Sequence, residues 1–150
     1  EKLDRAMTAT VLGRMAAITE AEYLETQTFS DVPLDAWFAG AVNWAAAQKI
    51  VNGNGDGTFD PEGCITREQL AAMLYRWAVQ NGRAAGAPDT SAVARFADGG
   101  TVSAWAAEAM AWAVEAGLIQ GTDVNTLEPE GNATRAEAAA ILQRYEAMAA

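Results

Sequence analysis

The sequence contains no histidine, a single cysteine and no long hydrophobic run, and it has half as many basic residues as acidic ones. The lack of histidine removes the commonest general base and metal ligand of enzymes. A lone cysteine, Cys64, allows neither an intrachain disulfide nor a cysteine-rich metal cluster. No stretch approaches the roughly 18 to 20 apolar residues of a membrane span. These absences argue against catalysis, against a metal or other cofactor, and against membrane insertion.

Charge excludes a further class of partner. Lysine and arginine number 10 against 20 aspartate and glutamate residues, which gives a net charge of −10. Such a chain repels the phosphates of nucleic acid except at local basic sites. What is present is a chain of 150 residues, enough for one domain with a core. Its alanine-rich hydrophobic fraction favours helices packed through small side chains, and we expect Cys64 to be a buried or half-buried filler.

One short motif occurs three times. The stretch 65–70, Ile-Thr-Arg-Glu-Gln-Leu, returns at 133–138 and more loosely at 3–8. In the first two of these copies a threonine N-cap is followed three residues later by Gln or Glu, which is the pattern of a capping box. Each copy therefore predicts the start of a helix.

An arginine follows the cap in every copy, as Arg5, Arg67 and Arg135. The helix macrodipole disfavours a cation there by roughly 0.3 to 1 kcal/mol, so the threefold occurrence needs another reason. An arginine beside free helix N–H groups makes a compact site for a carboxylate or phosphate. In the alternative, each arginine pairs with an acidic side chain of a neighbouring repeat. The spacing alone leaves both interpretations open.

A longer repeat surrounds the motif. Its offset is 67 residues at first and 68 later, so one residue has been inserted near Gly99 and Gly100. The matching pairs are Phe29 and Phe96, Asp31 and Asp98, Trp37 and Trp105, Trp44 and Trp112, Gly53 and Gly121, Pro61 and Pro129, Arg67 and Arg135. The helix of the first copy also aligns Arg14 with Arg76 and Arg144. A register kept this far indicates one supersecondary unit copied and stacked.

The repeats predict the domain organisation. We expect residues 1–18 to be the second helix of a truncated first repeat, and 29–80 and 95–150 to be two complete repeats. The segments 19–28 and 83–94, rich in polar and small residues, are predicted linkers.

Local signals predict the elements of each complete repeat. Asp4 is a predicted N-cap of the first helix of the chain, and Asp35 of the helix that carries Trp37 and extends to about Lys49. The glycine-rich stretch 53–57 predicts tight turns with positive φ.

Taken together, Phe-x-Asp, the tryptophan helix, Gly-x-x-x-Gly-x-Phe-x-Pro and Ile-Thr-Arg-Glu resemble the S-layer homology (SLH) module of bacterial cell-surface proteins. The resemblance implies a mainly α fold: three tandem helix-loop-helix repeats with pseudo-threefold symmetry around a central three-helix bundle. It also implies a non-catalytic module, extracellular at the bacterial cell wall or S-layer, that binds secondary cell wall polysaccharide. The polysaccharide of this family often carries pyruvate ketals, and each ketal carries a carboxylate.

By this resemblance Arg5, Arg67 and Arg135 receive the ligand carboxylate, and Thr66 and Thr134 lie beside two of them. Asp4 replaces threonine in the first copy, which weakens that site.

The resemblance assigns roles to an aromatic pair and an acidic pair. Trp37 and Trp105 offer an apolar platform for a sugar ring or belong to the core. Asp31 and Asp98 accept hydrogen bonds from sugar hydroxyls or stabilise a turn.

Glycines and the second tryptophan pair complete the set. Gly53 and Gly121 let the backbone approach the ligand, or they are required by turn geometry alone. Trp44 and Trp112 are predicted core residues.

Two departures from the family pattern bear on function. Lys49 stands where the third copy has Gly117. About 36 residues of a full repeat are missing ahead of Leu3, counted from the spacing of Phe29 and Ile65. Self-association that completes the truncated repeat is therefore an expectation.

Three other functions compete with anchoring. The first is a surface-layer assembly module acting through protein–protein contacts. The second is a calcium-dependent module, because the stretch 52–57 resembles the start of an EF-hand loop, although its twelfth position is Gly63 and not glutamate. The third is an enzyme, for which the chain offers carboxylates but no nucleophile with a base and no phosphate loop.

Overall fold

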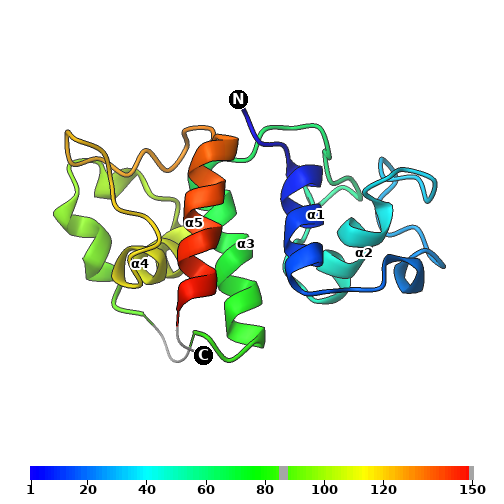
Figure 1. Ribbon diagram of the computed structural model, residues 1–150. Helices are drawn as coiled ribbons and strands as arrows, with labels where there is room; N and C mark the ends of the chain where they lie inside the picture. Colours follow the sequence, from blue (N-terminus) through cyan, green and yellow to red (C-terminus); the bar gives the residue numbers. More distant parts are fainter. Residues whose placement is uncertain (85–87, 149–150) are drawn as a thin grey trace. The chain divides into compact units, whose positions relative to one another are not determined.

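Every regular element among residues 1–84 and 88–148, which the computed structural model of the chain describes, is a helix (Figure 1). The α-helices are α1 (Arg5–Met15), α2 (Ala39–Ala47), α3 (Arg67–Gln80), α4 (Ala107–Glu115) and α5 (Arg135–Ala147). Short 3-10 helices lie between them: η1 (Glu20–Tyr23), η2 (Thr90–Arg95), η3 (Gly99–Thr101) and η4 (Ala104–Ala106). The predicted mainly α fold is confirmed, whereas the pseudo-threefold arrangement stays a prediction.

Two predicted segments extend beyond the described residues. Residues 85–87 of the linker 83–94 and residues 149–150 of the repeat 95–150 lie outside them. None of the described helices is long and apolar enough to cross a membrane.

Contacts divide the chain into two compact units. Residues 3–65 form one, here called the N-terminal unit, and residues 66–150 with residues 1–2 form the other, the C-terminal unit. The N-terminal unit holds α1, η1 and α2, and the C-terminal unit holds the remaining helices. The units therefore divide the sequence repeat 29–80 between its first and its second helix.

The predicted helix starts are present. Thr66 and Thr134 each accept a hydrogen bond from the backbone N–H three residues on, and the side chains of Gln69 and Glu137 complete both capping boxes. Asp4 caps α1 by accepting from the Met7 N–H at 2.7 Å. Because a side-chain cap satisfies a backbone donor that the helix leaves unpaired, these starts are fixed locally.

In the N-terminal unit, α1 packs against α2 through small side chains. Ala6 and Ala9 on α1 and Ala41 on α2 are buried. In the same unit the rings of Phe29 and Phe59 stack with centroids 5.3 Å apart, which joins the segment before α2 to the end of the glycine-rich loop.

In the C-terminal unit, α3 and α5 lie side by side (Figure 1). Their N-terminal ends are joined by the ion pair of Arg67 and Glu137. Further along the helices, the rings of Trp77 and Tyr145 lie 5.3 Å apart. Trp112 of α4 contacts the same Tyr145 ring, so one aromatic cluster holds three helices together. Trp44 and Trp112 are both buried, as predicted.

The predicted cap at Asp35 is wrong. Residues 33–39 form two successive turns, closed by hydrogen bonds from the Ala36 N–H to the Pro33 carbonyl and from the Ala39 N–H to the Ala36 carbonyl. As a result α2 begins only at Ala39, without a side-chain cap. The tight turns follow Pro33, whose ring fixes φ and provides no N–H.

Cys64 is exposed, which corrects the expectation of a buried or half-buried filler. It lies in an extended segment where its backbone bridges to Asp4. Successive side chains of an extended chain point to opposite sides, and the next residue, Ile65, takes the buried side.

Candidate functional site

A groove of about 230 Å³ opens in the C-terminal unit between α3, α5 and the loop 118–127. We call it the α3–α5 groove. It is lined by Arg67, Leu118, Ile119, Gln120, Gly121, Thr122, Thr126, Leu127, Glu137, Ala140, Ile141 and Arg144. Pockets that hold drug-sized ligands span roughly 300–1,000 Å³, so this groove suits one monosaccharide-sized group. It contains two guanidinium groups, one carboxylate and two threonine hydroxyls.

The helix N–H groups expected to bind an anion are already occupied. At α3 the Arg67 N–H donates to the Gly131 carbonyl at 2.9 Å and the Glu68 N–H to the Pro129 carbonyl at 3.0 Å. The third N–H, that of Gln69, donates to the cap hydroxyl at 3.2 Å. The expectation of free N–H donors beside the arginine is therefore wrong for this helix. Any anion bound here must be held by side chains.

The same pattern occurs at the other two helix starts. In the N-terminal unit the Arg5 N–H donates to the Gly63 carbonyl and the Ala6 N–H to the Pro61 carbonyl. In the C-terminal unit the Arg135 N–H donates to the Glu1 carbonyl at 2.8 Å. At each of the three helix starts, the acceptor is a backbone carbonyl just before another N-cap residue, at Gly63, Gly131 and Glu1. These hydrogen bonds therefore connect each helix start to the segment that precedes another helix.

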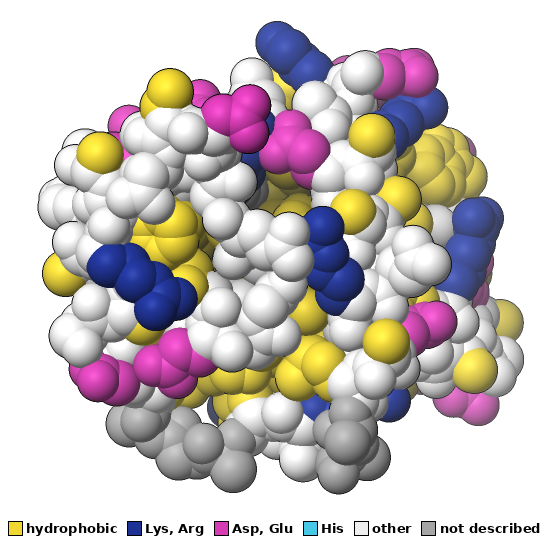
Figure 2. Space-filling view, turned by 60° about the vertical axis from the view of Figure 1, so that its left-hand side comes forward, with side chains coloured by type: hydrophobic (Ala, Val, Ile, Leu, Met, Phe, Trp, Pro, Cys, Tyr) yellow, Lys and Arg dark blue, Asp and Glu magenta, His cyan; other side chains and the backbone are white. Residues whose placement is uncertain are grey.

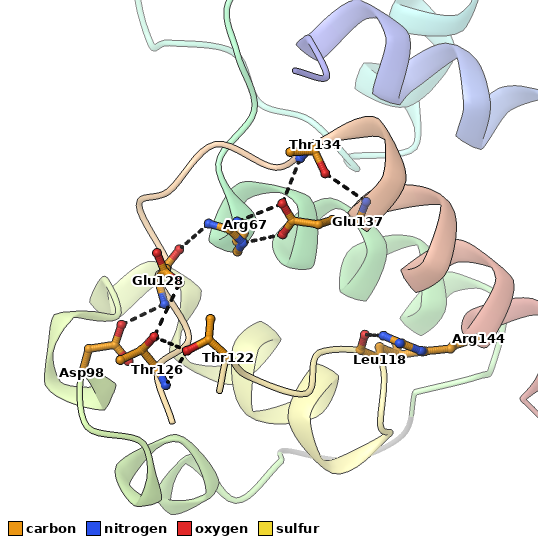
Figure 3. A network of polar contacts seen from close by, with 9 residues as sticks. All are labelled: Arg67, Asp98, Leu118, Thr122, Thr126, Glu128, Thr134, Glu137 and Arg144. Carbon is orange, nitrogen blue, oxygen red and sulfur yellow. Dashed lines mark hydrogen bonds and ion pairs between the residues drawn. The ribbon is translucent and has the colours of Figure 1, made fainter. Parts of the chain in front are cut away.

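Arg67 is held by an acidic residue of the next sequence repeat (Figure 3). Its Nε donates to Glu137 Oε2 at 2.7 Å and its Nη2 to Glu137 Oε1 at 2.9 Å, which is a bidentate contact. Its Nη1 reaches the Glu128 carbonyl at 3.4 Å. For Arg67 the structure thus contains the pairing that the sequence left open as the alternative to ligand binding.

Glu137 is shifted toward its ionised form by this contact. Burial by itself raises the pKa of the Glu137 carboxyl, but the hydrogen bonds and charge of Arg67, together with hydrogen bonds from Thr134, outweigh it and lower the pKa below the ordinary value. At neutral pH the pair is a carboxylate and a guanidinium whose charges cancel within the groove wall.

Arg5 and Arg135 make different contacts from Arg67. The Arg5 Nε donates to the Phe59 carbonyl at 2.8 Å, and its guanidinium lies 4.9 Å from the centre of the Phe59 ring. Burial lowers the pKa of Arg5, an effect that the charges of Asp60 and Asp31 oppose. Arg135 pairs with the exposed Glu1 at 3.2 Å and is not among the lining residues of the α3–α5 groove.

Asp31 and Asp98 make the same backbone hydrogen bonds at equivalent positions of the sequence repeat. The carboxylate of Asp31 accepts from the N–H groups of Phe59 and Asp60 at 2.9 and 2.8 Å. That of Asp98 accepts from the N–H groups of the equivalent residues 127 and 128 at 2.7 and 2.8 Å (Figure 3). Both aspartates therefore tie the end of the loop to the start of its repeat, which is the turn-stabilising role; contact with a sugar stays a prediction.

Gly53 and Gly121 are required by packing against the repeat itself. Gly53 has φ of 73°, and a Cβ there would lie 2.5 Å from the Phe29 ring. Gly121 has φ of 77°, and its Cβ would lie 2.7 Å from the ring of Phe96. The left-handed backbone and the aromatic neighbour each exclude a side chain. Gly121 also lines the α3–α5 groove, whereas ligand contact at either glycine stays a prediction.

Trp37 and Trp105 are exposed, at 61% and 56%, so neither belongs to the core. Trp105 borders a second cavity of about 340 Å³ between α3 and the start of α4. Tyr75, Arg76 and Glu108 contribute polar groups to this cavity. An exposed indole beside hydroxyl, guanidinium and carboxylate groups has the chemistry of a sugar platform, and the platform role of both tryptophans stays a prediction.

Sequence reasoning missed Arg144 as a site residue. This side chain extends from α5 along the groove, and its Nη1 donates to the Leu118 carbonyl at 3.0 Å (Figure 3). The signal was present in the repeat, since Arg14, Arg76 and Arg144 occupy equivalent positions. What the repeat could not provide was the neighbouring element that this face of α5 meets, which is the loop 118–127.

Two other features bear on the competing functions. Asp56 in the glycine-rich loop accepts from the N–H and the hydroxyl of Thr58, and these bonds lower its pKa. The described residues contain no group of three or more acidic, cysteine or histidine residues that could hold a metal ion.

On the face drawn in Figure 2, lysine and arginine side chains lie singly among polar and apolar ones, not in a continuous basic patch.

Comparison with known proteins gives three informative relatives. An amylopullulanase from Thermoanaerobacterium thermosulfurigenes is 33% identical over 92% of this chain and 7% of its own length. A cellulosome-anchoring protein from Acetivibrio thermocellus is 27% identical over 95% of this chain and 31% of its own length. The S-layer protein sap of Bacillus anthracis is 33% identical over 91% of this chain and 15% of its own length. The chain thus spans less than a third of each of these relatives.

These similarities agree with the expected location. The third relative is by its name an S-layer protein, and another relative from Acetivibrio thermocellus, 33% identical over 81% of this chain, is a cell surface glycoprotein, which supports an extracellular position at the cell wall or S-layer. The family model of the S-layer homology domain matches residues 28–71 and 95–139, which together are more than half of the chain. The protein is therefore a member of the S-layer homology domain family.

Proposed function

We propose that this domain is a non-catalytic module that attaches a larger exported protein to the bacterial wall by binding an anionic, pyruvylated secondary cell wall polysaccharide. The observation that carries the proposal is the α3–α5 groove, which has the size of one sugar unit and contains the guanidinium groups of Arg67 and Arg144. Guanidinium is the side-chain group best matched to a carboxylate, because its planar fork forms two parallel hydrogen bonds.

Because the chain is strongly acidic overall, its binding of an anionic polymer must depend on a few contacts within the groove. A chain with a net charge of −10 gives an anionic polymer no general attraction. Binding must therefore depend on a few directed contacts, in which the pyruvate ketal supplies the carboxylate and the sugar ring supplies apolar and hydroxyl groups. Thr122 and Thr126, whose hydroxyls lie 2.7 Å apart on the groove wall, are suited to contact sugar hydroxyls.

The relatives include both an enzyme and an anchoring protein, which fits attachment as the shared role of this stretch of sequence. An amylopullulanase and a cellulosome-anchoring protein share this stretch of sequence although the former is an enzyme and the latter an anchoring protein. A module common to proteins of such different purpose is explained by a shared attachment role.

The test is calorimetric titration with a purified pyruvylated wall-polysaccharide fragment and with the same fragment after its ketals have been removed. We expect binding of the first and at least a tenfold weaker binding of the second, because a charge-assisted bidentate contact is lost. Equal binding of both would overturn carboxylate capture. Binding of neither, together with self-association in sedimentation velocity, would favour the alternative of a surface-layer assembly module acting through protein–protein contacts.

A further inference from the structure

The two guanidinium groups of the α3–α5 groove are not equally available. Arg67 uses Nε and Nη2 on Glu137, at 2.7 and 2.9 Å, and directs Nη1 to the Glu128 carbonyl. Its side chain is only 21% exposed. A ligand carboxylate could reach the fork of Arg67 only by displacing Glu137.

Displacing Glu137 would also disturb a helix start. Glu137 Oε1 accepts from the Thr134 N–H at 3.4 Å, and the Glu137 N–H donates to the Thr134 hydroxyl at 3.0 Å. These two contacts form the capping box of α5. The Glu137 side chain is therefore fixed both by the ion pair and by the capping box, and a ligand must compete with both interactions.

Arg144 has no such competitor. Among the residues that the structure describes, no carboxylate forms an ion pair with Arg144. Arg144 is exposed and donates through Nη1 to the Leu118 carbonyl. That single bond anchors the side chain over the groove and leaves Nε and Nη2 for a ligand.

The repeat explains why the two guanidinium groups come from different helices. Within each helix the second arginine follows the first by nine residues, as in Arg67 and Arg76 or Arg135 and Arg144. Nine residues span about two and a half turns, which places the two arginines of one helix on opposite faces. In agreement with this, Arg67 lines the α3–α5 groove while Arg76 lines the second cavity.

We propose that Arg144, and not Arg67, receives the ligand carboxylate in the α3–α5 groove, and that Glu137 holds Arg67 as part of the groove wall. This assignment rests on the proposed function, because it names the residue that binds the anionic group at the same site. It replaces the role that the family resemblance gave to Arg67.

The experiment uses a defined probe and its neutral counterpart. The probe is a methyl hexosaminide carrying a 4,6-linked pyruvate ketal, and the counterpart is the same sugar with the ketal carboxylate converted to a carboxamide. The two have nearly the same shape and differ in charge. The ratio of their dissociation constants measures carboxylate recognition apart from binding of the sugar ring.

Three variants are compared with the unmodified chain. We expect Arg144→Ala to weaken binding of the carboxylate probe by at least about tenfold and to bring the ratio close to one. We expect Arg144→Lys to lose part of the ratio, because a lysine keeps the charge but not the planar fork. The double variant Arg67→Ala with Glu137→Gln removes the ion pair, and the glutamine keeps the capping box of α5 as Gln69 does at α3, so we expect it to keep the ratio.

Arg95→Ala is the matched control, since it removes a guanidinium that lies over the Phe96 ring and does not line the groove. Circular dichroism of each variant shows that the helices are kept. If Arg144→Ala keeps the ratio while the double variant loses it, the assignment is overturned and the proposed function stands. If the unmodified chain binds neither probe, the proposed function is overturned and the assignment with it.

Discussion

At the scale of single residues, the arginines at equivalent positions of the repeat make different contacts. Arg5 donates to a backbone carbonyl and covers a phenylalanine ring, Arg67 forms a bidentate ion pair, and Arg135 pairs with an exposed glutamate. The residue three positions after each helix cap is methionine, glutamine or glutamate in turn. Because their surroundings differ in charge and burial, the three arginines cannot have one common affinity for an anion.

The ion pair of Arg67 predicts how stability depends on pH. The folded-state pKa of Glu137 lies below its ordinary value, so between the two values the folded chain binds fewer protons than the unfolded chain. The stabilisation is therefore complete above the ordinary pKa and is lost as the pH falls through the lowered one. With a third of the Glu137 side chain exposed, we expect Glu137→Gln to cost no more than about 1 kcal/mol at pH 7.

Urea unfolding at pH 7 and pH 3 checks this. The difference between the unmodified chain and Glu137→Gln should shrink from pH 7 to pH 3, because pH 3 lies below the ordinary pKa of a glutamate and protonation removes the charge that the ion pair uses. Glutamine keeps the capping box, as Gln69 already does at the start of α3. A difference that stays constant or widens in acid would contradict the ion-pair explanation.

At the scale of elements, the ends of the helices carry a shared feature. After α2 and α4 the chain turns through a left-handed residue, which is Lys49 with φ of 61° in one repeat and Gly117 with φ of 78° in the other. A residue with a Cβ costs roughly 1 to 2 kcal/mol in this conformation, whereas glycine does not. Lys49 is exposed, so no packing compensates for the strain.

We therefore expect Lys49→Gly to stabilise the chain by about 1 kcal/mol, even though glycine also makes the unfolded chain more flexible. The reciprocal change, Gly117→Ala, should destabilise it by a similar amount, since no atom lies within 4 Å of the added Cβ and the backbone strain alone is tested. The midpoints of urea unfolding, compared between each variant and the unmodified chain, measure these changes in stability. A loss of stability in Lys49→Gly would mean that the lysine makes a contact that outweighs its strain.

Helix starts differ in how well the sequence predicts them. Those of α3 and α5 follow from Thr66 and Thr134, whose capping boxes are local and involve residues three positions apart. Those of α2 and α4 have no side-chain cap and follow turns or a 3-10 helix. Their position depends on packing against other elements, so the cap predicted at Asp35 failed.

At the scale of the whole molecule, compact units and sequence repeats do not coincide. The N-terminal unit joins α1 to α2, which are predicted from the sequence to belong to different repeats. The C-terminal unit joins α3, which is predicted to share one repeat with α2, to α4 and α5. The family model instead matches along the sequence repeats. A duplicated stretch of sequence is therefore not the unit that buries a core.

The net charge of −10 predicts an unusual response to salt. If the proposed ligand is anionic, long-range repulsion slows its approach, and salt screens that repulsion by reducing the Debye length from about 30 Å at 0.01 M to about 8 Å at 0.15 M. We expect the association rate constant of the carboxylate probe to rise over this range. That of the carboxamide should not change. Stopped-flow tryptophan fluorescence measures both, and a falling rate for the carboxylate would contradict the prediction.

The sequence by itself determined the class of the fold, the repeats and the helix starts with side-chain caps, because these depend on periodicity and on contacts only a few residues apart. It also predicted the positive φ of Gly53 and the burial of Trp44 and Trp112, whereas for Gly121 it left turn geometry and ligand approach as alternatives.

Only the tertiary structure decided which groups the arginines meet. That Glu137 occupies Arg67, that backbone carbonyls occupy the helix N–H groups, and that Arg144 extends into the α3–α5 groove all depend on contacts between residues at least 26 positions apart in the chain. Spacing within a repeat places a side chain on a helix face. It does not specify the partner on the next element, because that partner is set by how the helices pack.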